Sequence, residues 1–144
     1  MIIIAIGDGL GNQMFQYAFY YAMKEHYKQS TVLFDKEFYG SVNEHNGIEL
    51  EKVFNLRLPF STRKQAMVLA DYNGNLKKKH PIINTVWAIR AIISGRKESY
   101  LAVDGGTSYY KEIFELNPLK SYYLRGNWIN ESYFKKYRGI KYYR

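Results

Sequence analysis

The chain begins with an apolar run that is followed directly by a glycine-rich turn. The run is Met1-Ile2-Ile3-Ile4-Ala5-Ile6, and the turn is Gly7-Asp8-Gly9-Leu10-Gly11. Because β-branched residues suit a pleated surface, such a run is typical of a strand that is buried on both faces of a sheet. Glycine accepts positive φ and so permits a tight turn. The pattern predicts a buried strand, a turn and then a helix.

The predicted helix begins near Asn12, and its first N–H groups have no partner within the helix. These amides and the positive end of the helix dipole favour an anion such as a phosphate or diphosphate. Asn12 and Gln13 add side-chain amides at the same place. The sequence therefore predicts an anion-binding site at Gly9, Gly11, Asn12 and Gln13, with a purely geometric turn as the alternative.

The spacing of the glycines excludes two common phosphate-binding motifs. The dinucleotide fingerprint requires a third glycine at the position that Asn12 occupies. A P-loop ends in Gly-Lys, and no Gly-Lys pair occurs in the chain.

A second strand is predicted at Thr31–Phe34, after a largely apolar helix that ends in the polar stretch from Lys24 to Ser30. A strand-helix-strand unit makes its two strands parallel. Asp35 follows at the carboxyl end of the second strand, where α/β sheets place ligand contacts. It is a candidate acceptor for a ribose or sugar hydroxyl, and capping of the next turn is the alternative.

The remaining chain gives a coarser pattern. The predicted elements are helices over Ile48–Phe54, Arg63–Ala70 and residues 82–93, strands at Tyr100–Val103 and Tyr122–Leu124, a turn at Asp104–Gly106, and a helix beginning near Asn130. The stretch Tyr109–Leu116 fits either a helix or an extended segment. One α/β domain over residues 1–144 is expected from the length.

Three stretches resemble the α-1,2-fucosyltransferases of glycosyltransferase family 11. Gly7 to Ala18 is similar to the family's opening Gly-Gly-Leu-Gly-Asn-Gln-Met-Phe-Gln-Tyr-Ala, with Asp8 in place of the first glycine. His45 to Phe54 is similar to His-x-Gly-Phe-x-Leu-x-x-Val-Phe, with Ile48 in place of phenylalanine. This second stretch implies that His45 lines a substrate cleft, whereas a lone histidine of this kind otherwise serves as a cap or a surface group.

The third stretch, Gly126 to Phe134, resembles Gly-Tyr-Trp-Gln-Ser-Glu-x-Tyr-Phe less closely. Gly126, Trp128, Tyr133 and Phe134 agree, Glu131 keeps the family's spacing, and Asn127, Ile129 and Asn130 replace Tyr, Gln and Ser. The resemblance implies that Trp128 and Glu131 belong to the substrate cleft. The alternative places Trp128 and Tyr133 in the core behind the cleft.

The resemblance implies a Rossmann-like amino-terminal domain, a parallel sheet with flanking helices, from a two-domain enzyme of the GT-B type. Such enzymes transfer fucose from GDP-L-fucose to the 2-hydroxyl of a galactoside, in glycan or polysaccharide biosynthesis, without a required metal or cofactor. Gly9, Gly11, Asn12 and Gln13 would then contact the donor. The general base stays open among Asp8, Asp35, Glu49 and Glu131.

The family's His-x-Arg-Arg-Gly-Asp element, which holds the donor diphosphate, has no counterpart, because no His-x-Arg triplet occurs in the sequence. The chain therefore resembles only the amino-terminal, acceptor-side half of a family member. Its expected partners are a sugar nucleotide, a galactoside glycan and a carboxy-terminal domain. On its own, this half is expected to transfer no fucose.

The net charge of +8 and the aromatic content of 17% favour anionic partners with flat or sugar-like faces. A sugar nucleotide, an anionic membrane surface and a nucleic acid all qualify. The basic run Lys77–His80 precedes the apolar helix expected over 82–93, so peripheral membrane contact is an alternative to core packing. A specific nucleic-acid module is disfavoured, because the basic residues form no recognisable RNA-binding signature. A non-catalytic carbohydrate-binding or scaffolding remnant is the stronger rival.

The chain contains no cysteine, which excludes disulfides, zinc-thiolate sites and cysteine nucleophiles. The apolar run before Gly7 is too short for the core of a signal peptide or for a membrane span. These features predict a cytoplasmic location, at the inner face of the membrane if the peripheral contact exists.

Overall fold

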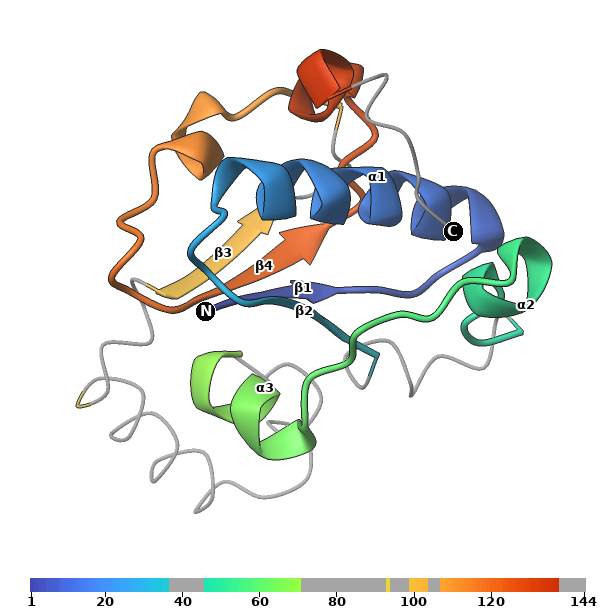
Figure 1. Cartoon of the computed structure of the whole chain (residues 1–144), viewed down its shortest axis with the longest axis horizontal. Helices are drawn as coiled ribbons and strands as arrows, with labels where there is room; N and C mark the ends of the chain where they lie inside the picture. Colours follow the sequence, from blue (N-terminus) through green and yellow to red (C-terminus); the bar gives the residue numbers. More distant parts are fainter. Residues whose placement is uncertain (37–45, 71–92, 94–98, 104–106, 138–144) are drawn as a thin grey trace, which may run out of the picture.

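The structure is a computed structural model that describes residues 1–36, 46–70, 93, 99–103 and 107–137. Its four described strands form one sheet in the order β2-β1-β4-β3, and every pairing is parallel (Figure 1). The strands are β1 (Ile2–Ala5), β2 (Val32–Asp35), β3 (Tyr100–Val103) and β4 (Tyr122–Gly126). The predicted α/β class with a parallel sheet is confirmed, and the architecture is compatible with a Rossmann-like fold.

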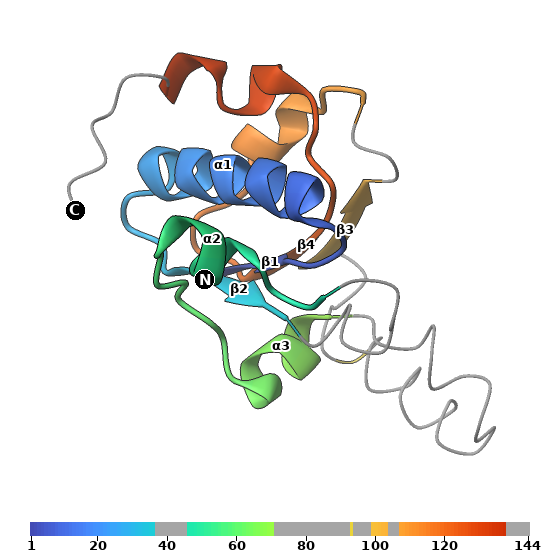
Figure 2. The ribbon, with the colours of Figure 1, turned by 90° about the vertical axis from the view of Figure 1, so that its right-hand side faces the viewer.

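Helices lie on both sides of this sheet. They are α1 (Leu10–His26), α2 (Leu50–Phe54) and α3 (Arg63–Leu69), with 3-10 turns η1 (Lys111–Phe114), η2 (Glu131–Tyr133) and η3 (Lys135–Tyr137). Figure 2 shows α1 and the 3-10 turns above the sheet and α3 below it.

The handedness of the connections explains which helix covers which face. The chain steps from β1 to β2 and from β3 to β4 in the same direction across the sheet, and from β2 to β3 in the opposite direction. Right-handed crossovers therefore place α1 and η1 on one face. The connection from β2 to β3 contains α2, whose Leu50 also packs in the cluster under α1. In the described part of that connection, α3 covers the second face.

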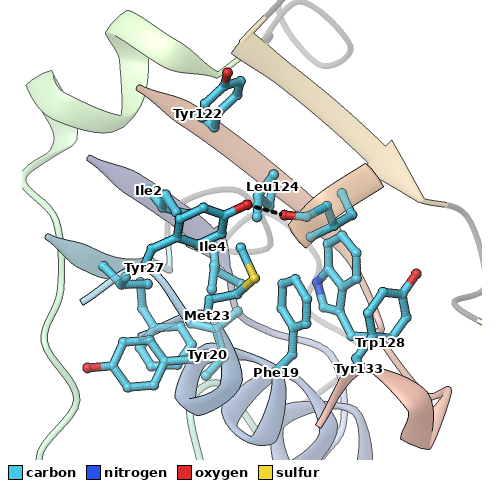
Figure 3. Close-up of a cluster of buried hydrophobic side chains, with 14 of the residues drawn as sticks. Ile2, Ile4, Phe19, Tyr20, Met23, Tyr27, Tyr122, Leu124, Trp128 and Tyr133 are labelled. Carbon is cyan, nitrogen blue, oxygen red and sulfur yellow. Dashed lines mark hydrogen bonds between the residues drawn. The ribbon is translucent and has the colours of Figure 1, made fainter. Parts of the chain in front are cut away.

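The core follows the alternation of side chains along the strands. Ile2 and Ile4 face α1, where they pack with Phe19, Tyr20 and Met23 (Figure 3). Ile3 and Ala5 lie in the smaller cluster under α3, together with Ala66, Leu69, Ala70 and Tyr123. Both faces of β1 are covered, which is why its sequence is continuously apolar.

The glycine turn differs from its prediction in one respect. Helix α1 begins at Leu10, two residues before the predicted start, and its N-cap Gly9 has a φ of −68°. The residue with a left-handed backbone is Asp8, with a φ of 60°. Among the described glycines only Gly47 has a positive φ, so the turn does not use the positive φ that its glycines permit, and the short polar side chain of Asp8 tolerates the left-handed position instead.

The other predicted elements shift by small amounts. Strand β2 lies one residue later than predicted, and β4 continues to Gly126. The ambiguous stretch before β4 contains the 3-10 turn η1, and the helix expected near Asn130 is the short turn η2, whose Ser132 N–H donates to the Asn130 side chain. Four predictions fall outside the described residues: the helix over 82–93, of which only Ile93 is described, the basic run Lys77–His80, the turn Asp104–Gly106, and His45.

Candidate functional site

The loops after β1 and β4 leave the same edge of the sheet. These two central strands are neighbours in parallel register, with Ile4 opposite Leu124. Ligands of open α/β sheets bind outside the carboxyl ends of the strands. The structure therefore brings the first stretch of resemblance, at Gly7, and the third stretch, at Gly126, to one place.

Gln16 joins these two loops through its side chain. It is fully buried in α1, where its Oε1 accepts from the Gly7 N–H at 3.0 Å and its Nε2 donates to the Gly126 carbonyl at 3.3 Å. Both backbone groups are buried polar groups that need partners. The amide of Gln16 therefore pairs positions that are far apart in the sequence.

Gln13 lies one turn earlier in α1, is also fully buried, and uses its whole hydrogen-bonding capacity. Its Nε2 donates to the Asp8 carbonyl at 2.7 Å and to the Gly47 carbonyl at 2.9 Å. Its Oε1 accepts from the N–H groups of Glu49 at 2.9 Å and Leu50 at 3.2 Å. Gln13 thus brings the second stretch of resemblance to the glycine loop. The Gln13 side chain, which the sequence suggested as a donor to a ligand, is therefore already engaged with the protein backbone.

The exposed part of the predicted anion site is the backbone at the start of α1. The first helical hydrogen bond runs from Gln13 N–H to the Gly9 carbonyl at 3.1 Å, so the N–H groups before it have no partner within the helix. No side chain caps the helix at Gly9, and its first turn contains no acidic residue. Gly11 is exposed, and a β-carbon there would meet no atom within 4 Å. The amides of Gly11 and Asn12 are therefore the groups best suited to a phosphate.

Asp8 modifies this anion site. Its side chain is half-buried, and it stands two residues before the first residue of α1. A carboxylate near the positive end of a helix stabilises the helix but repels a second anion. The glycine that family members carry here would impose neither this charge nor a side chain in a left-handed conformation.

Trp128 is a core residue in this structure. Its ring is fully buried and lies flat against Phe19, with 4.0 Å between the ring centroids, and it meets the edge of Tyr133 (Figure 3). The expected sugar contact would need this packing to open, so the structure favours the alternative that places Trp128 and Tyr133 behind the cleft. In the described structure, its indole Nε1 is buried without a hydrogen-bond partner.

Gly126 makes room for this tryptophan and for the edge of the sheet. A β-carbon at position 126 would lie 2.9 Å from the Val103 carbonyl oxygen and 3.1 Å from the ring of Trp128. Trp128 has a φ of 55°, a costly conformation for a bulky residue. The tight packing around Gly126 holds the tryptophan in that conformation.

Asp35 lies on the opposite face of the sheet from α1. Its register partner in β1 is Ala5, which belongs to the cluster under α3. The carboxyl is almost fully buried, and its Oδ2 accepts a hydrogen bond from the Tyr123 hydroxyl at 2.7 Å. The structure therefore does not bring Asp35 to the exposed amides of α1.

The two other acidic candidates are more accessible. Glu49 is half-buried, with its backbone N–H held by Gln13 and its carboxylate 3.4 Å from the Asn46 side chain. Glu131 is exposed in η2. Glu49 therefore lies in the segment that Gln13 holds beside the glycine loop.

Three buried tyrosines have shifted pKa values. Burial raises the pKa of Tyr20, Tyr27 and Tyr133 above the ordinary tyrosine value, because the charged phenolate is poorly solvated there. The hydroxyls of Tyr27 and Tyr133 donate to backbone carbonyls of the segment before β4, at Ile113 and Ser108. These tyrosines serve packing and tethering, and they offer no flat face to a nucleic-acid base.

The described part of the chain lacks two features, a metal-binding cluster and a membrane-spanning helix. No group of three or more His, Cys, Asp and Glu side chains is placed to hold a metal ion among the described residues. No helix in the described ranges is both long and apolar enough to cross a membrane.

Comparisons with family models, curated proteins and solved structures find no match to this chain.

Sequence reasoning missed Gln16 as a structural residue, although a signal was present. Gln13 and Gln16 are one turn apart on a helix face whose other buried members are Phe19, Tyr20, Ala22 and Met23. Polar residues on a buried face are costly unless they are hydrogen-bonded. That spacing indicates two paired amides, but it does not identify their partners.

Proposed function

We propose that this chain is the amino-terminal half of an α-1,2-fucosyltransferase. Such an enzyme transfers fucose from GDP-L-fucose to the 2-hydroxyl of a galactoside, and this half would form one wall of its cleft. The observation that carries the proposal is that all three stretches resembling the family meet at two buried glutamines. Gln16 reaches Gly126 across 110 positions, and Gln13 reaches Gly47 across 34.

The backbone at the start of α1 suits the diphosphate of the donor. Its uncapped amides and the positive helix end attract negative charge, a contribution of about 0.3–1 kcal/mol at an exposed helix terminus. An interaction of that size orients a diphosphate but does not hold it tightly. We infer that the arginine-rich element of the second half supplies the remaining charge, since no His-x-Arg triplet is present in these residues.

Transfer with inversion also requires a base for the acceptor hydroxyl. Among the four acidic candidates, Asp8 and Glu49 belong to segments that Gln13 holds at the glycine loop. Asp35 is engaged with Tyr123 on the other face of the sheet. We therefore expect a base contributed by this half to come from the wall around Gln13, and Glu49→Gln in an extended enzyme tests that expectation.

Binding of nucleotide and polymer distinguishes the proposal from its rivals. GDP, GDP-fucose, lactose and a short DNA oligomer are titrated into the purified chain at low and high salt. We expect GDP and GDP-fucose to bind weakly, with a Kd of about 1 mM. This affinity corresponds to about 4 kcal/mol, so hydrogen bonds from the backbone amides must add to the contribution of the helix end. Oligomer binding that exceeds GDP binding at high salt would favour a nucleic-acid module. Lactose binding without any GDP binding would favour a carbohydrate-binding remnant.

A transfer assay tests the second part of the proposal. Labelled GDP-fucose and lactose are incubated with this chain alone and with a chain extended by a family carboxy-terminal half. With only one side of the cleft present, the diphosphate leaving group stays exposed to water, where charge contacts are weak. The short chain should therefore give no detectable transfer. Turnover by the short chain alone would contradict the half-enzyme proposal.

A further inference from the structure

The two glutamines of α1 are unusual for their position. Both side chains are fully buried on a helix face that otherwise packs aromatic and aliphatic residues against the sheet. An amide in such a place is destabilising unless its hydrogen bonds are made. Since an apolar side chain would serve packing at least as well, the bonds themselves are what these residues contribute.

These bonds connect three segments that surround one edge of the sheet. Gln16 holds Gly7 and Gly126, while Gln13 holds Asp8, Gly47 and the start of α2. Gly7 and Asp8 are consecutive residues, and each is hydrogen-bonded to a different glutamine, Gly7 to Gln16 and Asp8 to Gln13. A displacement of either residue therefore disturbs the bonds of both glutamines.

We propose that Gln13 and Gln16 are positioning residues of the nucleotide site. They contact no ligand, and they hold the glycine loop, the Gly47–Leu50 segment and Gly126 as one preorganised wall. The identity of the ligand in this inference rests on the proposed function, whereas the coupling between the segments does not. Preorganised amides bind an anion without first having to be ordered, so loosening the wall should weaken binding.

The sharpest variant is Gln13→Glu. A carboxylate keeps the acceptor for Glu49 and Leu50 but faces the carbonyls of Asp8 and Gly47, to which the native amide donates. At neutral pH we expect GDP affinity to fall about tenfold relative to the native chain. At acidic pH the neutral acid regains one donor, so the ratio of the two Kd values should approach one.

A matched control separates positioning from general stability. Tyr27→Phe removes a buried hydroxyl that bonds Ile113 and Leu116 at the other end of α1. Thermal unfolding measures how much stability each of the two variants loses. GDP is then titrated at a temperature at which Gln13→Glu and Tyr27→Phe are both folded. We expect the control to bind GDP within twofold of the native chain. Equal loss of affinity in Gln13→Glu and in the control would overturn the positioning role.

Hydrogen exchange tests the coupling without any ligand, and it therefore separates a failure of this inference from a failure of the proposed function. We expect Gln16→Met to accelerate exchange at Gly7, and also at Glu49 and Leu50, which Gln16 does not contact. Should that variant fail to fold, Gln16→Glu keeps the acceptor for Gly7 and loses only the donor to Gly126. If the native chain binds no GDP, the proposed function fails and the exchange pattern decides the coupling. Faster hydrogen exchange at Gly7 alone, or equally fast exchange at all amides of the sheet, would overturn the proposed coupling.

Discussion

The Tyr123 hydroxyl in β4 donates a 2.7 Å hydrogen bond to Oδ2 of Asp35 in β2, across the intervening strand β1. The register partner of Asp35 in β1 is Ala5, whose small side chain leaves room for this contact. The bond joins two strands that are not neighbours in the sheet. It is also a buried polar contact beside the apolar cluster under α3.

Removing this hydroxyl should destabilise the sheet. Tyr123→Phe takes one partner from a buried carboxyl, and we expect the free energy of unfolding to fall by about 1–3 kcal/mol. Urea denaturation measures the change. Tyr109→Phe, at a tyrosine with an exposed ring, is the control and should change stability by less than about 0.5 kcal/mol. Equal stability of both variants would contradict the structural role of the bond.

Substitution by alanine should change the stability of the protein in opposite directions at two glycines, Gly126 and Gly11. At Gly126 a β-carbon meets the Val103 carbonyl and the Trp128 ring, and overpacking of this kind costs about 1–3 kcal/mol. At Gly11 the β-carbon meets nothing, and alanine within a helix gains up to about 1 kcal/mol over glycine. Thermal unfolding of the two variants checks the signs. A stable Gly126→Ala protein would show that Trp128 repacks easily.

Asp8 offers a variant that should improve nucleotide binding. Asp8→Gly removes a negative charge before α1 and relieves a side chain from a left-handed backbone. We expect tighter GDP binding and a stability change below about 1 kcal/mol, because the relief of strain opposes the loss of a favourable charge at the helix start. Asp8→Asn also removes the charge but tolerates the left-handed position. Both variants should bind GDP equally well if charge controls affinity, and a gain in Asp8→Gly alone would assign the effect to the backbone.

The raised pKa values of the buried tyrosines predict loss of stability in alkali. A pKa above the unfolded value of 10.0 means that the folded state holds its protons more tightly. This contribution is complete below pH 10 and is lost as the pH rises through the folded pKa values. Unfolding free energy measured across that range should therefore fall, and Tyr27→Phe should give a shallower fall. A flat profile above pH 10 would contradict the burial of these hydroxyls.

The local elements of the fold could be predicted because their signals are local. The apolar run, the glycine turn and the apolar helix lie within the first 26 residues, and the parallel pairing of β1 with β2 follows from the handedness of one crossover. The role of Gln13 could not be predicted, and for Trp128 the sequence left both a sugar contact and a core position open. Gln13 bonds Gly47 across 34 positions, and Trp128 stacks on Phe19 of α1. Local spacing does not reveal such partners, and it does not distinguish a donor to a ligand from a donor to the backbone.

Asp35 illustrates the same limit. Its place at the carboxyl end of a strand was predicted correctly, but the face to which its side chain turns depends on the register with Ala5. A shift of one residue would have turned the carboxyl toward α1. The register is a property of the assembled sheet, so sequence reasoning could not exclude Asp35 from the proposed nucleotide site.

The central claim is that the amides at the start of α1 bind a nucleotide diphosphate. The most direct measurement is a titration of the ¹⁵N-labelled chain with GDP, followed by amide chemical shifts. We predict saturable shifts at Leu10, Gly11 and Asn12, and none at Arg63 and Lys64, which are basic residues of α3 on the other side of the sheet. Unchanged amides at the start of α1, or shifts confined to α3, would contradict the claim.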